Sequence, residues 1–234
     1  MSGNTILPKD LKVLSFDLDD TFWDCAPAIA HAERSLYRWH KKNTPRIVQH
    51  HDEASLLAFR VQVRQRNPGL CGCVTAMRLQ GLRELLEEFS YPAEWAEEAF
   101  EVFYRARSQV VLYSGVIDLL EELGTRYALA AITNGNADLD RIGIAHYFDR
   151  IYAADLEMKA KPDADMFRRC TEHFKVNSAQ IMHIGDNPVA DIHGGIIAGV
   201  QTLWFNQHAL EWPHADYSPD YEVRSIRQMK ELLR

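Results

Sequence analysis

Acidic side chains directly follow a short apolar stretch near the start of the chain. Val13-Leu14-Ser15-Phe16 is rich in β-branched and aromatic residues and too short for a helix, which predicts a buried strand. Asp17, Asp19 and Asp20 come next, followed by the hydroxyl of Thr21. Clustered carboxylates repel one another, so they stay ionised only where a cation or solvent balances their charge. This strand end is therefore a candidate cation or acid–base site.

Other polar side chains follow apolar stretches much later in the chain. Thr133 ends the stretch 127–132, and Asp186 comes shortly after the stretch 181–184. In open parallel sheets, ligands bind beyond the carboxyl ends of the strands, so we expect these side chains to meet the early acidic cluster at one edge. We expect a lysine from Lys159-Ala160-Lys161-Pro162 to join them.

These residue types together point to phosphoryl chemistry. Carboxylates without histidine or thiolate neighbours suit a hard cation with oxygen ligands, and Mg²⁺ is the natural candidate. A lysine and a hydroxyl beside that cation would neutralise the charged oxygens of a phosphoryl group. One carboxylate can attack phosphorus and form an acyl-phosphate, while a second serves as general acid and then as general base. The residues alone thus predict Mg²⁺-assisted phosphoryl transfer.

The part of the chain beyond residue 113 alternates between expected helices and expected strands. The expected strands are residues 127–132, 151–154, 181–184 and 200–205. This alternation implies right-handed crossovers and predicts an α/β fold, a doubly wound parallel sheet with helices on both faces. The early strand at 13–16 belongs to the same sheet. We therefore expect a catalytic core built from residues 1–23 and 110–234.

Between these two core segments the apolar residues recur at helical spacing. Breaks fall at residues 43–45, 67–69 and 90–92, where asparagine, proline, glycine and serine interrupt the pattern. About four helices without a strand are expected. Residues 24–109 are therefore predicted to form an inserted all-helical domain.

Four short motifs resemble those of the haloacid dehalogenase-like hydrolases. In chain order they are Asp17-Leu18-Asp19-Asp20-Thr21, Thr133-Asn134-Gly135, Lys161-Pro162, and Gly185-Asp186 through Asp191. They follow expected strands in the family's order and cover the core, roughly residues 10–25 and 110–205. The resemblance implies the same doubly wound core. It also implies that the helical insertion is a cap domain, which closes over the site and sets substrate choice.

The resemblance implies a role for each motif residue. Asp17 would attack phosphorus and become the aspartyl-phosphate, and Asp19 would protonate the leaving oxygen and later activate water. Thr133 and the backbone N–H of Asn134 would hold the phosphate oxygens. Lys161 would neutralise the nucleophile and the phosphate together, and it stands directly before proline as in the family pattern.

The family pattern also implies a magnesium site. Its ligands would be Asp17, the main-chain carbonyl of Asp19, and Asp186. Asp191 would orient the loop that carries Asp186. Lys159 is a rival for the lysine role, although it lacks the following proline.

The second aspartate separates reaction classes within the family. Its 2-haloacid dehalogenases form an ester at the first aspartate, need no metal and lack the second one, so Asp19 favours a phosphatase. Phosphomutases keep both aspartates and stay open, as do nucleotide and sugar-phosphate phosphatases. A binding module that has lost activity should lack the nucleophile or the acid, whereas this chain has both.

A finer resemblance concerns residues 16–21 and 131–137. These stretches look most like a bacterial phosphatase branch linked to riboflavin biosynthesis. That branch acts on 5-amino-6-(5-phospho-D-ribitylamino)uracil and on FMN. The resemblance therefore implies a small phosphorylated metabolite as the substrate.

Bulk properties limit the remaining functions. The formal net charge of -7 over 234 residues argues against binding nucleic acid or an anionic membrane. Met1–Lys9 lacks the apolar region of a signal peptide, and no apolar run reaches membrane-spanning length. The four cysteines show neither a disulfide framework nor zinc-site spacing, as is typical of free thiols. We expect a cytoplasmic protein, and a monomer is compatible with the sequence.

Side chains outside the motifs have two interpretations each. Trp23 could stack on a substrate ring or pack the cap hinge, and we expect packing. Arg60, Arg64 and Arg66 could supply a second anion contact from the cap, although we expect a solvated helix face. His183 lies on an expected buried strand, where we expect a hydrogen-bonded core histidine.

Overall fold

Parallel strands form the centre of the molecule. The computed structural model describes residues 7–8 and 10–234, and within them six strands pair in the order β3-β2-β1-β4-β5-β6. Every pairing is parallel, which confirms the predicted fold class. The strands are β1 (Val13–Phe16), β2 (Ala128–Thr133), β3 (Arg150–Ala153), β4 (Ile181–Gly185), β5 (Gln201–Phe205) and β6 (Tyr221–Val223). The three-residue β6 carries too short an apolar pattern to be predicted.

Residues 1–6 and 9 lie outside the described residues. They belong to the expected core segment 1–23 and to the N-terminal stretch Met1–Lys9, which is expected to lack a signal peptide. Among the described residues, no helix has the length and apolar character needed to cross a membrane.

The strand order reverses direction next to β1. Strands β2 and β3 extend to one side of it, whereas β4, β5 and β6 extend to the other. Leu14 is in register with Leu129 of β2 and with Met182 of β4. Ligands of doubly wound sheets bind in the crevice at such a reversal, outside the carboxyl ends of the strands. The ends of β1 and β4 therefore mark the expected site.

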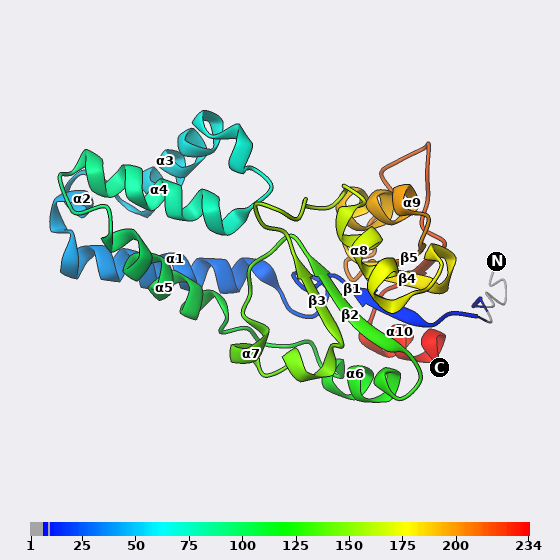
Figure 1. Ribbon diagram of the computed structural model, residues 1–234. Helices are drawn as coiled ribbons and strands as arrows, with labels where there is room; N and C mark the ends of the chain where they lie inside the picture. Colours follow the sequence, from blue (N-terminus) through cyan, green and yellow to red (C-terminus); the bar gives the residue numbers. More distant parts are fainter. Residues whose placement is uncertain (1–6, 9) are drawn as a thin grey trace.

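Core helices cover both faces of the sheet (Figure 1). On one face lie α6 (Val116–Gly124), α7 (Leu139–Ile142) and α10 (Ile226–Leu233), and on the other α8 (Asp165–Phe174) and α9 (Gly194–Ala198). Leu14 and Phe16 of β1 pack with the first group, and Val13 packs with the second. This alternation arises because successive side chains of a strand point to opposite faces. Burial on both faces holds β1 in place.

Short helical turns complete the core. They are the 3₁₀ turns Ala145–Tyr147 and Ser178–Gln180 and the π-helical turn Pro188–His193. The last of these is followed directly in the chain by α9. The side chain of Asn187 accepts hydrogen bonds from the N–H groups of Val189 and Ala190 and so starts this turn.

Helices from the insertion form a separate lobe (Figure 1). They are α1 (Cys25–Asn43), α2 (Pro45–His50), α3 (Glu53–Arg66), α4 (Val74–Glu88) and α5 (Trp95–Arg107), with a 3₁₀ turn at Pro68–Leu70. The expected breaks are present, and one more separates α2 from α3. There the Asp52 side chain accepts a hydrogen bond from the N–H of Ser55 and caps α3. The lobe has its own apolar core, which includes Phe59, Leu86 and Phe103. We propose residues 24–109 as the cap domain.

The two chain crossings between the lobes lie against each other. Trp23 pairs with Leu112 through an isolated antiparallel bridge, and the hydroxyl of Tyr113 donates to Asp24 at 2.6 Å. Trp23 is fully buried, so it packs at the hinge, as expected, and offers no exposed face for stacking. Asp20, which has a φ of 60°, accepts a hydrogen bond from the N–H of Cys25 at the start of α1.

Candidate active site

Three carboxylates gather where the strand order reverses. Asp17 directly follows β1, Asp186 directly follows β4, and Asp191 lies in the π-helical turn. One oxygen from each lies within 4.8 Å of the others. Burial raises the pKa of Asp186 to about 7, with the charges of Asp191 and Asp20 adding to the effect. A dense set of oxygen ligands that repel one another fits a hard divalent cation such as Mg²⁺.

Lys161 joins two of these carboxylates. Its buried Nζ lies 2.7 Å from Oδ1 of Asp17, 2.7 Å from Oδ1 of Asp191 and 2.5 Å from the carbonyl oxygen of Ile132. Burial alone would lower the pKa of Lys161, but the charges of Asp17 and Asp191 hold it above its ordinary value. Burial raises the pKa of Asp17, against the opposing effect of Lys161. A bound cation would favour the ionised form of this carboxyl.

The second motif positions this lysine. The side chain of Asn134 accepts a hydrogen bond from the N–H of Lys161 at 2.7 Å and donates one to its carbonyl oxygen at 2.9 Å. Thr133 is buried, and its hydroxyl accepts a hydrogen bond from the N–H of Gly135 at 2.9 Å. Lys159 instead points away, with 74% of its side chain exposed and its Nζ 3.4 Å from Asp163. Lys161 is therefore the lysine at this site.

A buried histidine supports Asp191 from behind. His183 Nε2 lies 3.1 Å from Oδ1 of Asp191, and its Nδ1 lies 3.0 Å from the hydroxyl of Ser15. Burial alone would raise the pKa of Asp191, but Lys161 and His183 hold this pKa well below its usual range. Oδ2 of Asp191 accepts a hydrogen bond from the N–H of Asn187 at 2.9 Å, which ties the loop after β4. His183 is thus the hydrogen-bonded core histidine that was expected, in direct contact with the site.

Asp19 faces the helical lobe. Its two carboxylate oxygens accept hydrogen bonds from Nη2 of Arg107 at 2.6 and 2.5 Å, and Oδ1 accepts another from Nε1 of Trp23 at 2.8 Å. Arg107 is 1% exposed and ends α5. A side chain at Gly135 would collide with Oδ2 of Asp19, so this glycine leaves room for the carboxylate.

Sequence reasoning missed Arg107. It lies outside every motif, and its only local signal is an arginine at the end of the insertion, close to the expected hinge. Its partner is 88 residues away in the chain, so the contact depends on how the lobes pack. The Asn134 side-chain contact with Lys161 was also missed, because these residues lie 27 positions apart in the chain and only the folding of the core brings them together.

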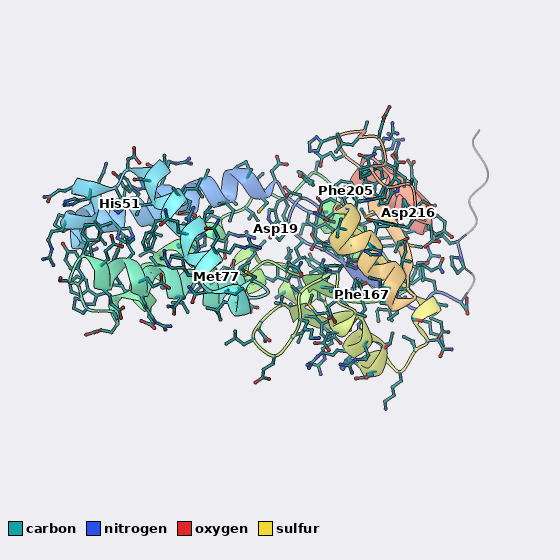
Figure 2. All side chains as sticks on the ribbon, turned by 90° about the horizontal axis from the view of Figure 1, so that it is seen from above. Asp19, His51, Met77, Phe167, Phe205 and Asp216 are labelled. Carbon is teal, nitrogen blue, oxygen red and sulfur yellow. The ribbon has the colours of Figure 1, made fainter. Side chains whose placement is uncertain are left out.

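All predicted site residues line one cavity of about 270 Å³ between β1, β2 and β4. Figure 2 shows Asp19 between the two lobes. The predicted motif residues that line the cavity are Asp17, Asp19, Thr133, Asn134, Lys161, Asp186 and Asp191. Acidic ligands for a cation, a lysine and a hydroxyl therefore surround a space that can hold a phosphoryl group.

A family profile of haloacid dehalogenase-like hydrolases matches residues 11–199, most of the chain. The chain belongs to the haloacid dehalogenase-like hydrolase family. It is an enzyme of the hydrolase class, and the resemblance seen in the motifs is confirmed.

Relatives within the haloacid dehalogenase-like family include phosphatases. The chain is 30% identical over 230 residues to the 5-amino-6-(5-phospho-D-ribitylamino)uracil phosphatase YigB of Escherichia coli, covering 95% of this chain and 96% of that protein. It is 33% identical to a phosphoserine phosphatase of Thermus thermophilus, over 71% of this chain and 70% of that one.

A solved structure of a family member described as a 2-haloacid dehalogenase, from Pseudomonas syringae pv. Tomato, superposes with a TM-score of 0.88. It is 35% identical, and the match covers 95% of this chain and 98% of that one. The names of these relatives thus cover two of the reaction classes discussed for the motifs, phosphatases and 2-haloacid dehalogenases. Asp19 bears on the choice between them.

Proposed function

We propose that the protein is a Mg²⁺-dependent phosphomonoester phosphatase that acts through an aspartyl-phosphate. The observation that carries this proposal is the single cavity that Asp17, Asp19 and Lys161 share with the acidic cluster. Asp17 is the nucleophile, and Lys161 at 2.7 Å neutralises its charge and that of the incoming phosphoryl group. Mg²⁺, held by Asp17, the main-chain carbonyl of Asp19 and Asp186, would stabilise the charge on the phosphoryl oxygens.

Two chemical steps follow from the positions of the aspartates. The carboxylate of Asp17 attacks phosphorus, and the leaving oxygen takes a proton from Asp19 as its bond to phosphorus breaks. Asp19 then removes a proton from water, which attacks the aspartyl-phosphate and releases phosphate and Asp17. In this structure Arg107 donates hydrogen bonds to both carboxylate oxygens of Asp19. For Asp19 to give and take protons, it must at some point in this cycle be free of full charge neutralisation by Arg107. Asp191 orients Lys161 and the loop after β4.

We further propose a small phosphorylated metabolite as the substrate, with 5-amino-6-(5-phospho-D-ribitylamino)uracil and FMN as the first candidates. The similarity to YigB along nearly the whole chain supports this choice. Nucleotide, phosphoserine and sugar-phosphate substrates are the alternatives within the phosphatase class. Initial rates on this panel decide among them, and a wide preference for sugar phosphates would remove the riboflavin assignment.

Replacement of the nucleophile tests the proposed mechanism. Asp17→Asn should lower phosphate release to background, because an amide cannot form the aspartyl-phosphate, while the far-UV circular dichroism spectrum stays unchanged. Asp140→Asn, which changes an exposed carboxyl in α7, is the matched control and should keep full activity. Phosphate release at the wild-type rate from Asp17→Asn would contradict the proposed mechanism.

Chelation separates the reaction classes. Phosphate release by the wild-type protein should stop with a chelator and return with Mg²⁺. Halide release from a 2-haloacid that persists with the chelator present would instead assign the protein to the dehalogenases.

A cytoplasmic location is also proposed. The four cysteines are free, as expected in a reducing compartment. Cell fractionation of the tagged chain checks this, and recovery in an oxidising compartment would contradict it.

A further inference from the structure

A second cavity lies between the helical lobe and the core. Its volume is about 360 Å³, and Asp19 and Gly135 line both this cavity and the site cavity. The remaining lining comes mainly from α1, α3, α4 and α5, including Met77, which Figure 2 shows on the cap side of Asp19. Asp19 protonates the leaving oxygen in the proposed function. The second cavity is therefore the space that adjoins the proposed acid on the side of the helical lobe.

Four arginines line this cavity, and among the described residues two carboxylates pair with them. They are Arg60, Arg64, Arg78 and Arg107. Arg107 pairs with Asp19, while Arg60 and Arg78 share Glu33. Within the described part of the chain, no side chain pairs with the guanidinium of Arg64. The cavity therefore has an excess of positive charge.

Two of these guanidinium groups also keep unused donors. Nη1 of Arg78 and Nη1 of Arg107 are buried, and no described residue accepts a hydrogen bond from either. Arg78 lies over the ring of Phe103 at 3.5 Å, which fixes the plane of its guanidinium. A buried donor without an acceptor costs free energy, so an oxygen acceptor from a ligand would be bound favourably here.

Apolar side chains form the rest of the cavity wall. They are Ile29, Val61, Val74, Met77 and Phe103. Such a wall suits a flat or apolar body better than a bare polyol chain, whose hydroxyls would lose hydrogen bonds to water. Arginine binds planar pairs of oxygen acceptors through two parallel hydrogen bonds.

We propose that this cavity receives the leaving group and that Arg64 and Arg78 bind a head group of oxygen acceptors carried on a flat, apolar body. A carboxylate and the carbonyl edge of a heterocycle share this chemistry. The inference rests on the proposed function, and it makes α3 and α4 the elements that set substrate choice. Arg60 and Arg64 line this cavity, and Arg64 is exposed, as expected for a solvated helix face, whereas Arg66 pairs with Glu84 outside it.

Two matched pairs of phosphate esters test the proposal. FMN and D-ribitol 5-phosphate share the phosphorylated ribityl chain, and only FMN carries a heterocycle with carbonyl oxygens. 4-Carboxyphenyl phosphate and phenyl phosphate share the ring, and only the first carries a carboxylate. Wild-type kcat/KM should be higher for the acceptor-bearing member of at least one pair, and the pair with the larger ratio identifies the head group.

Matched variants on α3 complete the experiment. Arg64→Gln should lower kcat/KM for the acceptor-bearing ester about tenfold more than for its plain counterpart, mainly through KM, since a charged hydrogen bond is lost in binding. Arg66→Gln lies on the same helix outside the cavity and should leave the ratio within each pair unchanged.

Equal kcat/KM within both pairs would overturn the inference, as would an equal loss on both members with Arg64→Gln. Either result would leave the proposed phosphatase function standing. Absence of phosphate release from all four esters would instead overturn the proposed function, and the inference with it.

Discussion

The position of the Asp19 carboxylate depends on two residues that have no role in the proposed chemical steps. Arg107 holds both carboxylate oxygens, and Gly135 provides the space that they occupy. Arg107 couples the helical lobe directly to the proposed acid and base. The geometry at this one carboxylate is therefore sensitive to changes of a single methyl group.

Gly135→Ala should reduce turnover strongly without unfolding the protein. The added Cβ would collide with Oδ2 of Asp19 and lie 3.3 Å from the hydroxyl of Thr133, so Asp19 must move. A misplacement of about 1 Å at a reacting group costs on the order of 10²-fold in rate, and we expect kcat for phosphate release to fall by about that factor.

The control for this change is Gly69→Ala, where a Cβ meets no atom within 4 Å. It should keep its kcat. Thermal melting of both variants checks that they are folded. Full activity of Gly135→Ala would show that Asp19 does not need its present position.

Helix α1 contains a histidine that makes the cap sensitive to acid. His40 is fully buried, its Nδ1 lies 2.8 Å from Thr44 Oγ1, and its Nε2 has no partner among the described residues. Burial lowers the pKa of His40 to about 4, partly opposed by Glu33. The unfolded chain binds a proton at its ordinary pKa near 6.5, so it takes up more protons than the folded chain between the two values. Stability is therefore lost as the pH falls through this window.

His40→Gln should remove this loss. Between pH 7 and pH 5 the wild-type free energy of unfolding should fall by about 2 kcal/mol more than that of the variant, on the basis of the linkage between protonation and folding. Urea unfolding at both pH values measures the difference. His208 is exposed and lies outside the helical lobe, so His208→Gln should show the same pH dependence of stability as the wild-type protein. Identical pH dependence of wild type and His40→Gln would contradict the assignment.

In the molecule as a whole, the acidic cluster should link metal binding to stability. Asp17, Asp186 and Asp191 repel one another when no cation is bound. A ligand at a hundred times its Kd stabilises a fold by about 2.7 kcal/mol, so Mg²⁺ should raise Tm. Asp186→Asn removes one ligand charge and should reduce this shift. Differential scanning calorimetry with Na⁺ at matched ionic strength as the control measures it, and equal shifts with both salts would refute a specific site.

The proposed division into two domains has its own test. Residues 24–109 contain a separate apolar core, so this fragment should fold alone, with a helical circular dichroism spectrum and a cooperative thermal transition. A spectrum typical of an unfolded chain would mean that the lobe needs the core, and the proposed boundaries would then be wrong.

Short-range patterns were enough to predict much of this protein. Strands such as 13–16 and 181–184 were visible because a strand buried on both faces is a nearly continuous apolar run, here interrupted by Ser15 and His183. The polar residues that follow them then had to meet, since parallel strands present their carboxyl ends at one edge. The very short β6 and α7, and the break between α2 and α3, were missed because so few residues carry little periodic signal.

Contacts across the lobes could come only from the tertiary structure. The pairing of Arg107 with Asp19, and the arginines around the second cavity, depend on how α3, α4 and α5 are placed against the core. That placement is the sum of many small packing contacts over distant parts of the chain, and no local spacing encodes it. The amino-acid sequence thus specifies the acidic strand end, its lysine and its hydroxyl. The fold decides that Asp19 turns toward Arg107, beside the space into which a leaving group can extend.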